Sequence, residues 1–174
     1  MECILLVNER DEEFGFADKL EVHKKGLLHR AFSIIIMNAK NRILIQRRAI
    51  DKYHSGGLWS NSCCSHQKNG ENLEKAIHAR LIYELGFDCK LKKILKFKYL
   101  TKFENGLIEH EIDHVFIGHF NGTPRPNYSE VADVKWVDYN TLVKDIQSFP
   151  EKYTYWFKIV LEKLDKAIFG ELSK

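Results

Sequence analysis

Residues 59–86 constrain the fold of this chain more than any other segment. The first part, residues 59–66, is β-rich and follows a loop that Gly56-Gly57 opens. From Glu71 the pattern becomes helical, and Gly86 is a natural helix C-cap. The apolar residues at three- and four-residue steps are Leu73, Ala76, Ile77, Leu81 and Leu85. The sequence therefore predicts a strand, a loop and a helix in succession.

Strand-like runs lie on both sides of this segment. They cover residues 3–7, 29–37, 42–46, 91–103, 107–120 and 134–137, and each is rich in β-favouring residues. Asn38 to Asn41 and Glu104-Asn105-Gly106 predict hairpin connections. Pro150 begins a last amphipathic helix. We expect an α/β (α+β) fold in one domain, residues 1–174, with a mixed sheet, one central helix and one C-terminal helix.

Length and charge exclude several classes of function. A chain of 174 residues with a net charge of +3 suits one globular domain that binds a small anion. No block of lysine or arginine supports nucleic-acid binding. No signal peptide is visible, and no apolar run approaches the roughly 18 residues of a membrane span. The four cysteines form no C-x-x-C spacing, so we expect reduced thiols in a cytoplasmic monomer.

Cys64 and His66 form the most informative pair of polar residues. An extended backbone sends side chains i and i+2 to one face, so both project into the same space. A thiol beside an imidazole suits a metal site, a nucleophile pair or a proton-transfer pair. The same alternation puts Cys63 on the opposite face.

A second group of side chains suits a divalent metal. His23, His29 and His66 with Glu109 and Glu111 give a mixed nitrogen and oxygen set. The two glutamates are two residues apart on a predicted strand, so they share a face and need a cation or a proton between them. Taken singly, each of these residues also fits a solvated surface.

The stretch 65–87 resembles the Nudix box, the loop–helix–loop that holds a metal-diphosphate in Nudix proteins. Glu71 and Glu84 remain from its acids. The departures are Ser65 for the opening glycine, Ala79 for the arginine, and Arg80 and Tyr83 for two metal-binding glutamates. A hydrolase that needs several carboxylates should not survive that loss. The diphosphate scaffold is retained and the hydrolytic metal cluster is not.

Residues 19–156 resemble one Nudix-fold family, the metal-dependent (type I) isopentenyl-diphosphate delta-isomerases. The matching segments are residues 19–23, 28–33, 47–49, 59–66, 83–86, 109–111 and 155–156. Gly56-Gly57 departs from the family, which often has a proline there. The resemblance implies a Nudix fold, with a mixed β-sheet sandwiched by helices.

The resemblance also implies a reaction and its catalytic residues. Isopentenyl diphosphate and dimethylallyl diphosphate would interconvert through a tertiary carbocation, which supplies isoprenoid biosynthesis. Two proton-transfer groups on opposite faces of the substrate are needed. Cys64 and Glu111 match these groups, with Tyr99 supporting Glu111. Trp156 would offer a π face to the cation. The alternative interpretation is that Trp156 is an aromatic residue of the hydrophobic core.

The ligands and substrate contacts follow from the same resemblance. One divalent metal (Mn, Mg or Zn) would be held by His23, His29, His66, Glu109 and Glu111. Magnesium bound with the substrate diphosphate would meet Glu84, which lies one helical turn from Arg80. The cations that match the family's phosphate-binding positions are Lys19, Arg48, Lys52 and Arg80, and Arg47 could substitute for its neighbour.

Two rival functions remain open from the sequence. One is a Nudix hydrolase acting on a nucleoside diphosphate, against which the replaced acids and Cys64 count. The other is a non-catalytic metal-binding or regulatory domain. Phosphate release from a panel of diphosphates would distinguish a hydrolase from an isomerase. Retained isomerase activity would exclude a non-catalytic domain.

The support of Tyr99 for Glu111 demands one hairpin register. A two-residue turn at Asn105-Gly106 would put the two side chains on opposite faces. A three-residue loop of Glu104-Asn105-Gly106, with Gly106 in the left-handed region, sets Tyr99 directly opposite Glu111. We expect the three-residue loop or an equivalent bulge.

Overall fold

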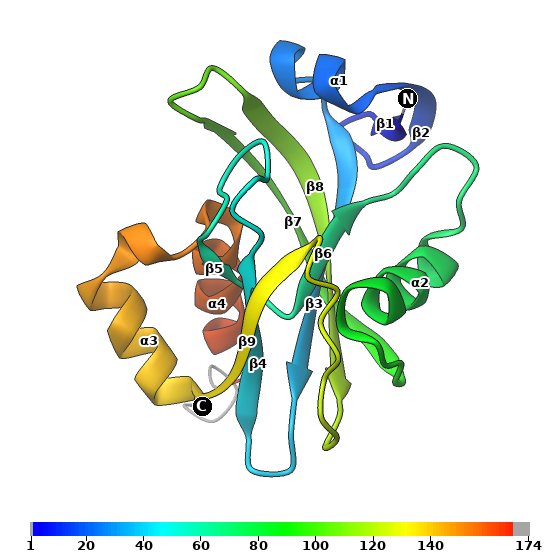
Figure 1. The fold of residues 1–174 in the computed structure, drawn as a ribbon. Helices are drawn as coiled ribbons and strands as arrows, with labels where there is room; N and C mark the ends of the chain where they lie inside the picture. The colour runs from blue at the N-terminus through cyan, green and yellow to red at the C-terminus, as the bar shows by residue number, and fades with distance from the viewer. Residues whose placement is uncertain (1, 169–174) are drawn as a thin grey trace.

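The computed structural model describes residues 2–168 and shows a mixed β-sheet with helices on both faces (Figure 1). The strands are β1 (Cys3–Val7), β2 (Glu13–Asp18), β3 (His29–Met37), β4 (Arg42–Arg48), β5 (Trp59–Ser60), β6 (Cys63–His66), β7 (Leu91–Lys102), β8 (Ile108–His119) and β9 (Val131–Asp138). The helices are α1 (Lys19–Lys25), α2 (Leu73–Leu85), α3 (Tyr139–Ser148), the short 3-10 helix η1 (Pro150–Lys152) and α4 (Tyr155–Ile168). This arrangement confirms the predicted α/β class.

Strand β3 is the centre of the sheet. One edge pairs in parallel with β8, from His29 opposite Glu111 to Met37 opposite His119. The far edge of β8 pairs antiparallel with β7. Strand β3 is buried along almost its whole length, as expected for a strand that is covered on both faces.

The other edge of β3 is shared by three strands, so the sheet divides. At the start of β3, His29 pairs with Leu6 of β1, and β1 pairs with β2. Residues 31–34 pair with β6, whereas Ile36 and Met37 pair with β4. Strand β4 then continues the sheet to β5 and β9. Because β4 and β6 leave β3 one after the other, their backbones need hydrogen-bond partners at the point of division.

Buried polar side chains between β5 and β6 supply those partners. Asn61 Nδ2 donates to Ile34 O at 3.3 Å and to Cys63 O at 2.6 Å. Ser62 Oγ accepts from Ile36 N at 2.8 Å and donates to Leu44 O at 2.6 Å. Both side chains lie in fully buried residues. They satisfy backbone groups that the ladder leaves unpaired, which explains a run of polar residues inside the sheet.

Helices α2 and α4 cover opposite faces of the sheet (Figure 1). The side chains of Phe32, Ile34 and Ile36 on β3 pack in one hydrophobic core with apolar residues of α2. Ile35 belongs to the second core, with Phe157, Val160, Leu161 and Leu164 of α4. Alternation along β3 therefore feeds both cores, and the predicted sandwich of the sheet by helices is confirmed.

Three elements were not predicted from the sequence: α1, α3 and β2. Helix α1 has only seven residues, too few for an apolar period. Its ends carried signals nonetheless, because Asp18 Oδ1 accepts from the backbone of Leu20 and Glu21, and Gly26 has φ 64°. Helix α3 likewise begins after a capping residue, Asp138.

The start of the last helix also differs from the prediction. Pro150 begins the 3-10 helix, and α4 begins only at Tyr155. Between them, Tyr153 forms a bridge with Trp59, and Thr154 N donates to Trp59 O at 2.9 Å. These contacts hold the chain extended for two residues, so a tertiary bond overrides the local helical pattern.

The predicted hairpin register is confirmed. Phe103 N donates to Leu107 O at 2.8 Å, Gly106 N donates to Phe103 O at 2.9 Å, and Gly106 has φ 84°. The loop therefore has three residues, with glycine in the left-handed region. Tyr99 lies directly opposite Glu111 in the ladder.

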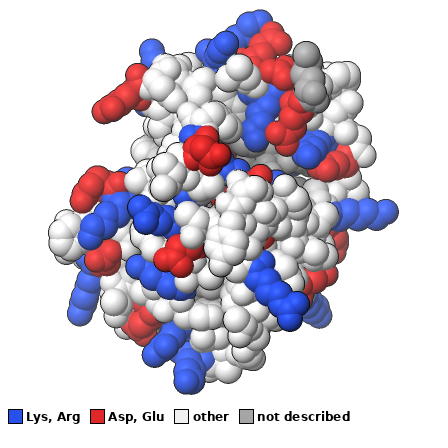
Figure 2. Space-filling model, in the orientation of Figure 1, with Lys and Arg blue, Asp and Glu red and all other residues white. Residues whose placement is uncertain are grey.

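The surface carries both signs of charge. Lysine and arginine side chains are interspersed with aspartate and glutamate over the face shown in Figure 2, as a net charge of +3 in a chain of this composition suggests. Within residues 2–168, no helix is long and apolar enough to cross a membrane.

The division of the sheet gives a stability prediction. Ser62→Ala leaves Ile36 N and Leu44 O without their hydroxyl partner in a dry interior. We expect the free energy of unfolding to fall by about 1–3 kcal/mol, measured by urea denaturation. Ser148→Ala, at an exposed residue of α3, is the control and should change it by less than about 0.5 kcal/mol. An equal, small effect of both substitutions would contradict the role given to Ser62.

Candidate active site

One pocket gathers most of the predicted residues. Among its lining residues are Lys19, Arg48, Lys52, Cys64, His66, Arg80, Glu84, Tyr99, Glu109, Glu111 and Trp156. His23 and His29 are fully buried beside it. Arg47 lies outside it, with Nε donating to Gly57 O at 2.9 Å. Alternation along β4 turns Arg47 away from Arg48, so the suggested substitution of Arg47 for Arg48 is wrong.

Strand β6 presents its two cysteines to opposite faces, as predicted. Cys64 lines the pocket together with His66. Cys63 is fully buried in the core under α2. Cross-strand pairing sets Cys64 beside Ser33 and His66 beside Ala31 on β3. The pocket thus receives Cys64 from one side of β3 and the acids of β8 from the other side.

Strands β7 and β8 bring a phenol to two carboxylates. Tyr99 Oη lies 2.9 Å from Glu109 Oε2 and 2.8 Å from Glu111 Oε2. A phenol has one proton, so it donates to one carboxylate at a time. Burial, then the charge of Glu111, raises the pKa of Tyr99 well above its ordinary value, so the phenol keeps its proton.

Three histidines from three elements converge next to these acids. Helix α1 supplies His23, β3 supplies His29 and β6 supplies His66. Their ring centroids lie 4.9–5.0 Å apart. Helix α1 is therefore a part of the site that the sequence pattern missed, although the residue it carries was predicted.

The tautomers of these histidines leave lone pairs inside the cluster. His23 Nδ1 lies 2.6 Å from Lys19 O, and His29 Nδ1 lies 2.8 Å from Leu27 O. A carbonyl oxygen only accepts, so each Nδ1 carries the hydrogen and each neutral Nε2 presents a lone pair. His23 Nε2 is buried without a hydrogen-bond partner among the described residues.

A carboxylate oxygen faces two of these imidazoles. Glu111 Oε1 lies 3.2 Å from His29 Nε2 and 2.9 Å from His66 Nε2. Burial lowers the pKa of His66 to about 3, although the bond to Glu111 opposes this. Burial also lowers the pKa of His23. Nitrogen and carboxylate oxygen atoms gathered in one buried cluster suit a positive charge between them, and a divalent metal ion would supply it.

The ligand atoms fall into two overlapping groups. His23, His29, His66 and Glu111 form one group, in which all the ligand atoms lie within 4.8 Å of one another. Glu109 was predicted with these four but belongs to a second group, with His23 and His54. The His/Glu cluster can hold a divalent metal, and His54 stands among its possible ligands. Burial, then the charge of Glu111, raises the pKa of Glu109 well above its ordinary value in the absence of a metal.

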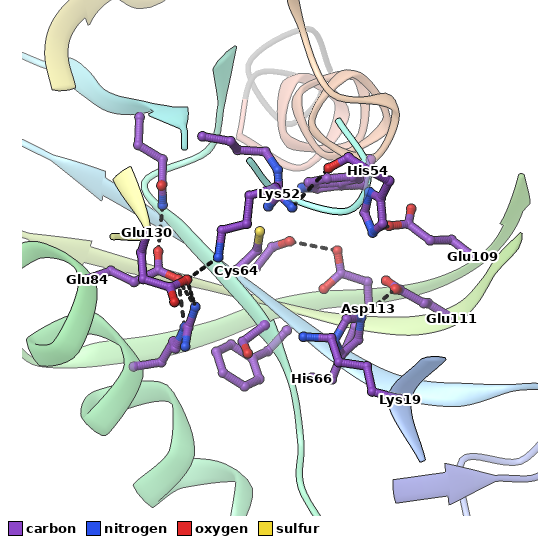
Figure 3. Close-up of a pocket in the computed structure, with 18 of the residues that line it drawn as sticks. Lys19, Lys52, His54, Cys64, His66, Glu84, Glu109, Glu111, Asp113 and Glu130 are labelled. Carbon is purple, nitrogen blue, oxygen red and sulfur yellow. Dashed lines mark hydrogen bonds and ion pairs between the residues drawn. The ribbon is translucent and has the colours of Figure 1, made fainter. Parts of the chain in front are cut away.

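Cationic and acidic side chains occupy the other half of the pocket. In Figure 3, Lys52, Glu84 and Glu130 lie on one side of Cys64, while His54, His66, Glu109 and Glu111 lie on the other. Arg80 Nη2 donates to Glu130 Oε2 at 2.6 Å, and Lys52 Nζ also pairs with Glu130. Two of the four cations that were predicted to bind phosphate, Lys52 and Arg80, therefore share one acidic partner.

Glu84 is fixed from two sides. Its Oε1 accepts from Arg80 Nε at 2.6 Å and its Oε2 accepts from Gln46 Nε2 at 2.7 Å. Residue Glu84 is 4% exposed. Arg80 and Glu84 face the same pocket, as their spacing of one helical turn predicted.

Trp156 sits at the apolar end of the pocket. Its Nε1 donates to Asn61 Oδ1 at 3.2 Å, which fixes the indole. The Arg48 guanidinium lies 5.2 Å from the indole ring centroid, a cation–π contact. Arg48 Nε is buried without a hydrogen-bond partner among the described residues. The indole therefore orients a guanidinium group whose Nε–H is still available to a ligand.

Cys64 is a protonated thiol in this setting. Burial raises its pKa to about 12, and the charge of Arg48 only partly opposes this. The thiol consequently holds a proton at neutral pH and is a poor nucleophile there. Of the three alternatives for a thiol beside an imidazole, this environment favours a proton-transfer group.

Sequence reasoning missed several polar residues that line the pocket, among them His54, Asp113, Glu130 and Gln46. Asp113 had a signal, because it continues the i, i+2 alternation of Glu109 and Glu111. Its Oδ2 accepts from Ser33 Oγ at 2.7 Å, and burial, then the charge of Glu111, raises its pKa to about 8. Gln46 also lay on a predicted strand, two residues before Arg48. His54 and Glu130 come from loops, whose positions depend on tertiary contacts.

Comparison with known proteins agrees with this geometry. The model of the NUDIX domain matches residues 27–157. The chain is 48% identical over 161 residues to isopentenyl-diphosphate Delta-isomerase 2 of Aromatoleum aromaticum, covering 92% of this chain and 85% of that protein. It is 50% identical over 163 residues to isopentenyl-diphosphate Delta-isomerase 2 of Photorhabdus laumondii, covering 94% and 92%.

The fold is also similar to solved Nudix structures. DR0079 of Deinococcus radiodurans superposes with a TM-score of 0.71 at 22% identity, covering 84% of this chain and 90% of that chain. The MutT protein of Methanosarcina mazei superposes with a TM-score of 0.66 at 17% identity, covering 80% and 94%. At these identities the likeness concerns the fold alone.

The neutral histidines give a pH prediction for metal-free protein. Burial, then the charge of Arg48, lowers the pKa of His54 to about 2, whereas the unfolded chain has a value of about 6.5. Below about pH 6.5 the unfolded state therefore binds more protons, and stability falls as pH falls. In His54→Gln this dependence should be shallower, by at most about 1.4 kcal/mol per pH unit. Urea denaturation of chelator-treated protein between pH 7 and 5 measures it, and parallel curves would contradict a neutral His54.

Proposed function

Because this chain belongs to the isopentenyl-diphosphate Delta-isomerase family of NUDIX-domain proteins, we infer that it interconverts isopentenyl diphosphate and dimethylallyl diphosphate. The observation that carries the inference is the placement of Cys64 and Glu111. They line one pocket from strands on the two sides of β3. With β3 between them, their backbones are two strand spacings apart, roughly 9–10 Å. A flat five-carbon chain fits between two such groups.

The reaction needs one group that gives a proton and another that takes one. Protonation of the terminal alkene carbon forms a tertiary carbocation, and loss of a proton from the neighbouring methylene forms the allylic product. The Cys64 thiol holds a proton because burial raises its pKa. Glu111 is the partner across β3, and the Tyr99 phenol, 2.8 Å from its Oε2, orients it and supplies a hydrogen bond.

The metal-binding part of the proposal uses His23, His29, His66, Glu109 and Glu111. A divalent ion (Mn, Mg or Zn) there would fix Glu111 and alter its proton affinity without touching the substrate carbons. The residues themselves fit this task, since the backbone carbonyls of Lys19 and Leu27 orient the rings of His23 and His29.

The diphosphate would occupy the half of the pocket that holds Lys52 and Arg80. Lys19 and Arg48 line the same pocket. Glu84 would bind a magnesium ion that arrives with the diphosphate. Lys52 and Arg80 would then exchange Glu130 for phosphate oxygens, which accept charge-assisted hydrogen bonds in the same way.

Trp156 would stabilise the carbocation by its π face and exclude water. A cation–π contact in a dry site contributes about 2 kcal/mol. Trp156 lines the pocket, and both Trp156 and Phe103 pack against the imidazole of His54. The proposal places this activity in a single domain, residues 1–174, acting as a cytoplasmic monomer on a small-molecule diphosphate.

A Nudix hydrolase remains the alternative activity. Two observations argue against it. Tyr83, at the position of a metal-binding glutamate of the Nudix box, is 51% exposed, and Arg80 stacks on its ring at 5.2 Å. Glu71 Oε2 accepts from the backbone of Lys68 at 2.9 Å and does not line the pocket. The carboxylates that a hydrolase would use are therefore replaced or turned away.

Incubation with isopentenyl diphosphate and magnesium tests the function directly. We expect an acid-labile allylic product and no phosphate release from a panel of diphosphates. Phosphate release without an allylic product would make the protein a hydrolase instead.

We predict that Cys64 is essential and that Cys63 is not. Cys64→Ala removes a proton-transfer group and should lower the isomerase rate by about 10²–10⁴-fold with the fold intact. Cys63→Ala, its neighbour on the opposite face, should cost only packing, of the order of 1 kcal/mol. Isomerase assays and denaturation of both variants measure this. Equal losses of activity in the two variants, with both folded, would contradict the assignment of Cys64 as the essential cysteine.

We also predict one tightly bound divalent ion. His23→Ala or Glu109→Ala should lower the metal content of the purified protein, because each removes a donor from the cluster. His114→Ala is the matched control, since His114 is equally buried but pairs with Asp11, at 2.8 Å, and does not line the pocket. Full occupancy in either of the first two variants would show that the ligand set is wrong.

A further inference from the structure

The loop between β4 and β5, residues 49–58, lies against both halves of the pocket. It carries Lys52 into the half that holds Arg80 and Glu130, and it turns His54 toward Glu109 (Figure 3). Few backbone bonds join it to the rest of the chain. Near its ends, Ala49 N donates to Glu130 O at 3.0 Å, Gly57 N donates to Arg48 O at 3.1 Å, and Arg48 N donates to Leu58 O at 2.9 Å. In its middle, Asn105 Nδ2 donates to Tyr53 O at 3.0 Å and Arg48 Nη2 donates to His54 O at 3.4 Å. The position of the middle therefore depends on contacts made by side chains.

Aromatic neighbours hold the imidazole of His54 in place. It stacks on Phe103 with centroids 4.9 Å apart and planes 12° apart. Tyr53 and Trp156 meet it edge to face. The residue is 7% exposed. These contacts leave one direction with polar groups, the direction of Glu109 and His23.

The nitrogen that points in this direction has no satisfactory partner. His54 Nε2 is buried without a hydrogen bond among the described residues, although it lies 3.2 Å from Glu109 Oε1. His54 Nδ1 lies 3.3 Å from Ser55 Oγ, which can accept its hydrogen. Nε2 then presents a lone pair to a carboxylate. That arrangement is unfavourable unless a proton or a cation lies between them.

The same cation serves the neighbouring histidines. His23 belongs to both groups of ligand atoms, and within each group the atoms lie within 4.8 Å of one another. His23 Nδ1 is engaged with Lys19 O, so His23 has one lone pair and can bind one ion only. An ion bound to His23 therefore lies next to the donor atoms of both groups. Together the groups offer imidazole and carboxylate donors, a set that suits Mn²⁺.

We propose that His54 is a further ligand of the divalent ion, and that it ties the loop of residues 49–58 to the metal. This rests on the proposed His/Glu metal site. Binding of the ion then fixes the loop, and with it Lys52, two residues away in the diphosphate half. Metal occupancy and the order of the diphosphate site become linked through one short segment.

Binding of Mn²⁺ to metal-free, full-length protein tests this proposal. His54→Ala should weaken Mn²⁺ binding by about tenfold or more, measured by calorimetry. Pulsed electron paramagnetic resonance should count one nitrogen ligand fewer in this variant. Amide hydrogen exchange of residues 49–58 should slow on Mn²⁺ binding in the parent protein and stay fast in the variant.

Two further variants separate ligation from packing. Phe103→Leu removes the ring that stacks on His54 but no donor atom, so it should keep the nitrogen count of the parent. His54→Gln keeps side-chain volume and serves if His54→Ala does not fold, with the same expected loss of one nitrogen ligand. Unchanged affinity and nitrogen count in a folded His54 variant would overturn the proposal. Absence of Mn²⁺ binding by the parent protein would overturn the metal site itself.

Discussion

The structure depends on how β3 uses its two edges. One edge pairs with β8 over nine residue pairs, and the other is shared by β1, β6 and β4 in succession. The buried side chains of Asn61 and Ser62 make this division possible, because they bond the backbone groups that no strand reaches. Without that polar insert, β6 could not bring Cys64 beside Ser33, opposite the acids of β8. The catalytic arrangement is thus a consequence of the local interruption of a sheet.

The same insert extends to the apolar end of the pocket. Asn61 Oδ1 accepts from Trp156 Nε1 and from Ser60 Oγ, and Ser60 Oγ lies 3.0 Å from Thr154 Oγ1. The helix that completes the second core is therefore joined to the point of division by hydrogen bonds, so Trp156 and Cys64 hold fixed positions relative to each other. Rigid support of this kind suits the proposed chemistry, in which a reactive carbocation is held away from water.

The sequence predicted most of the site and a coarser version of the fold. Residues on strands were placed correctly, because two-residue alternation decides which face Cys64, Tyr99 and Glu111 take. Residues in loops were not, because nothing local to His54 or Glu130 indicates where a loop folds back. Helix α1 was missed for its length, and the start of α4 was misplaced because bonds to Trp59 hold residues 153 and 154 extended. Sequence periodicity predicted most helices and strands correctly where an element was long enough to show a repeating pattern of apolar residues.

Glu130 gives the site a property that a cluster of bare cations would not have. It pairs with both Lys52 and Arg80 before any anion arrives. An incoming ligand therefore has to displace a carboxylate and does not bind to unpaired cations. Ions of single charge, such as chloride, compete poorly in such an exchange, whereas a multiply charged ligand engages several cations at once. When the product departs, the carboxylate returns to the same two partners. The built-in counter-ion therefore favours both selectivity and turnover, because it limits how tightly any one ligand is retained.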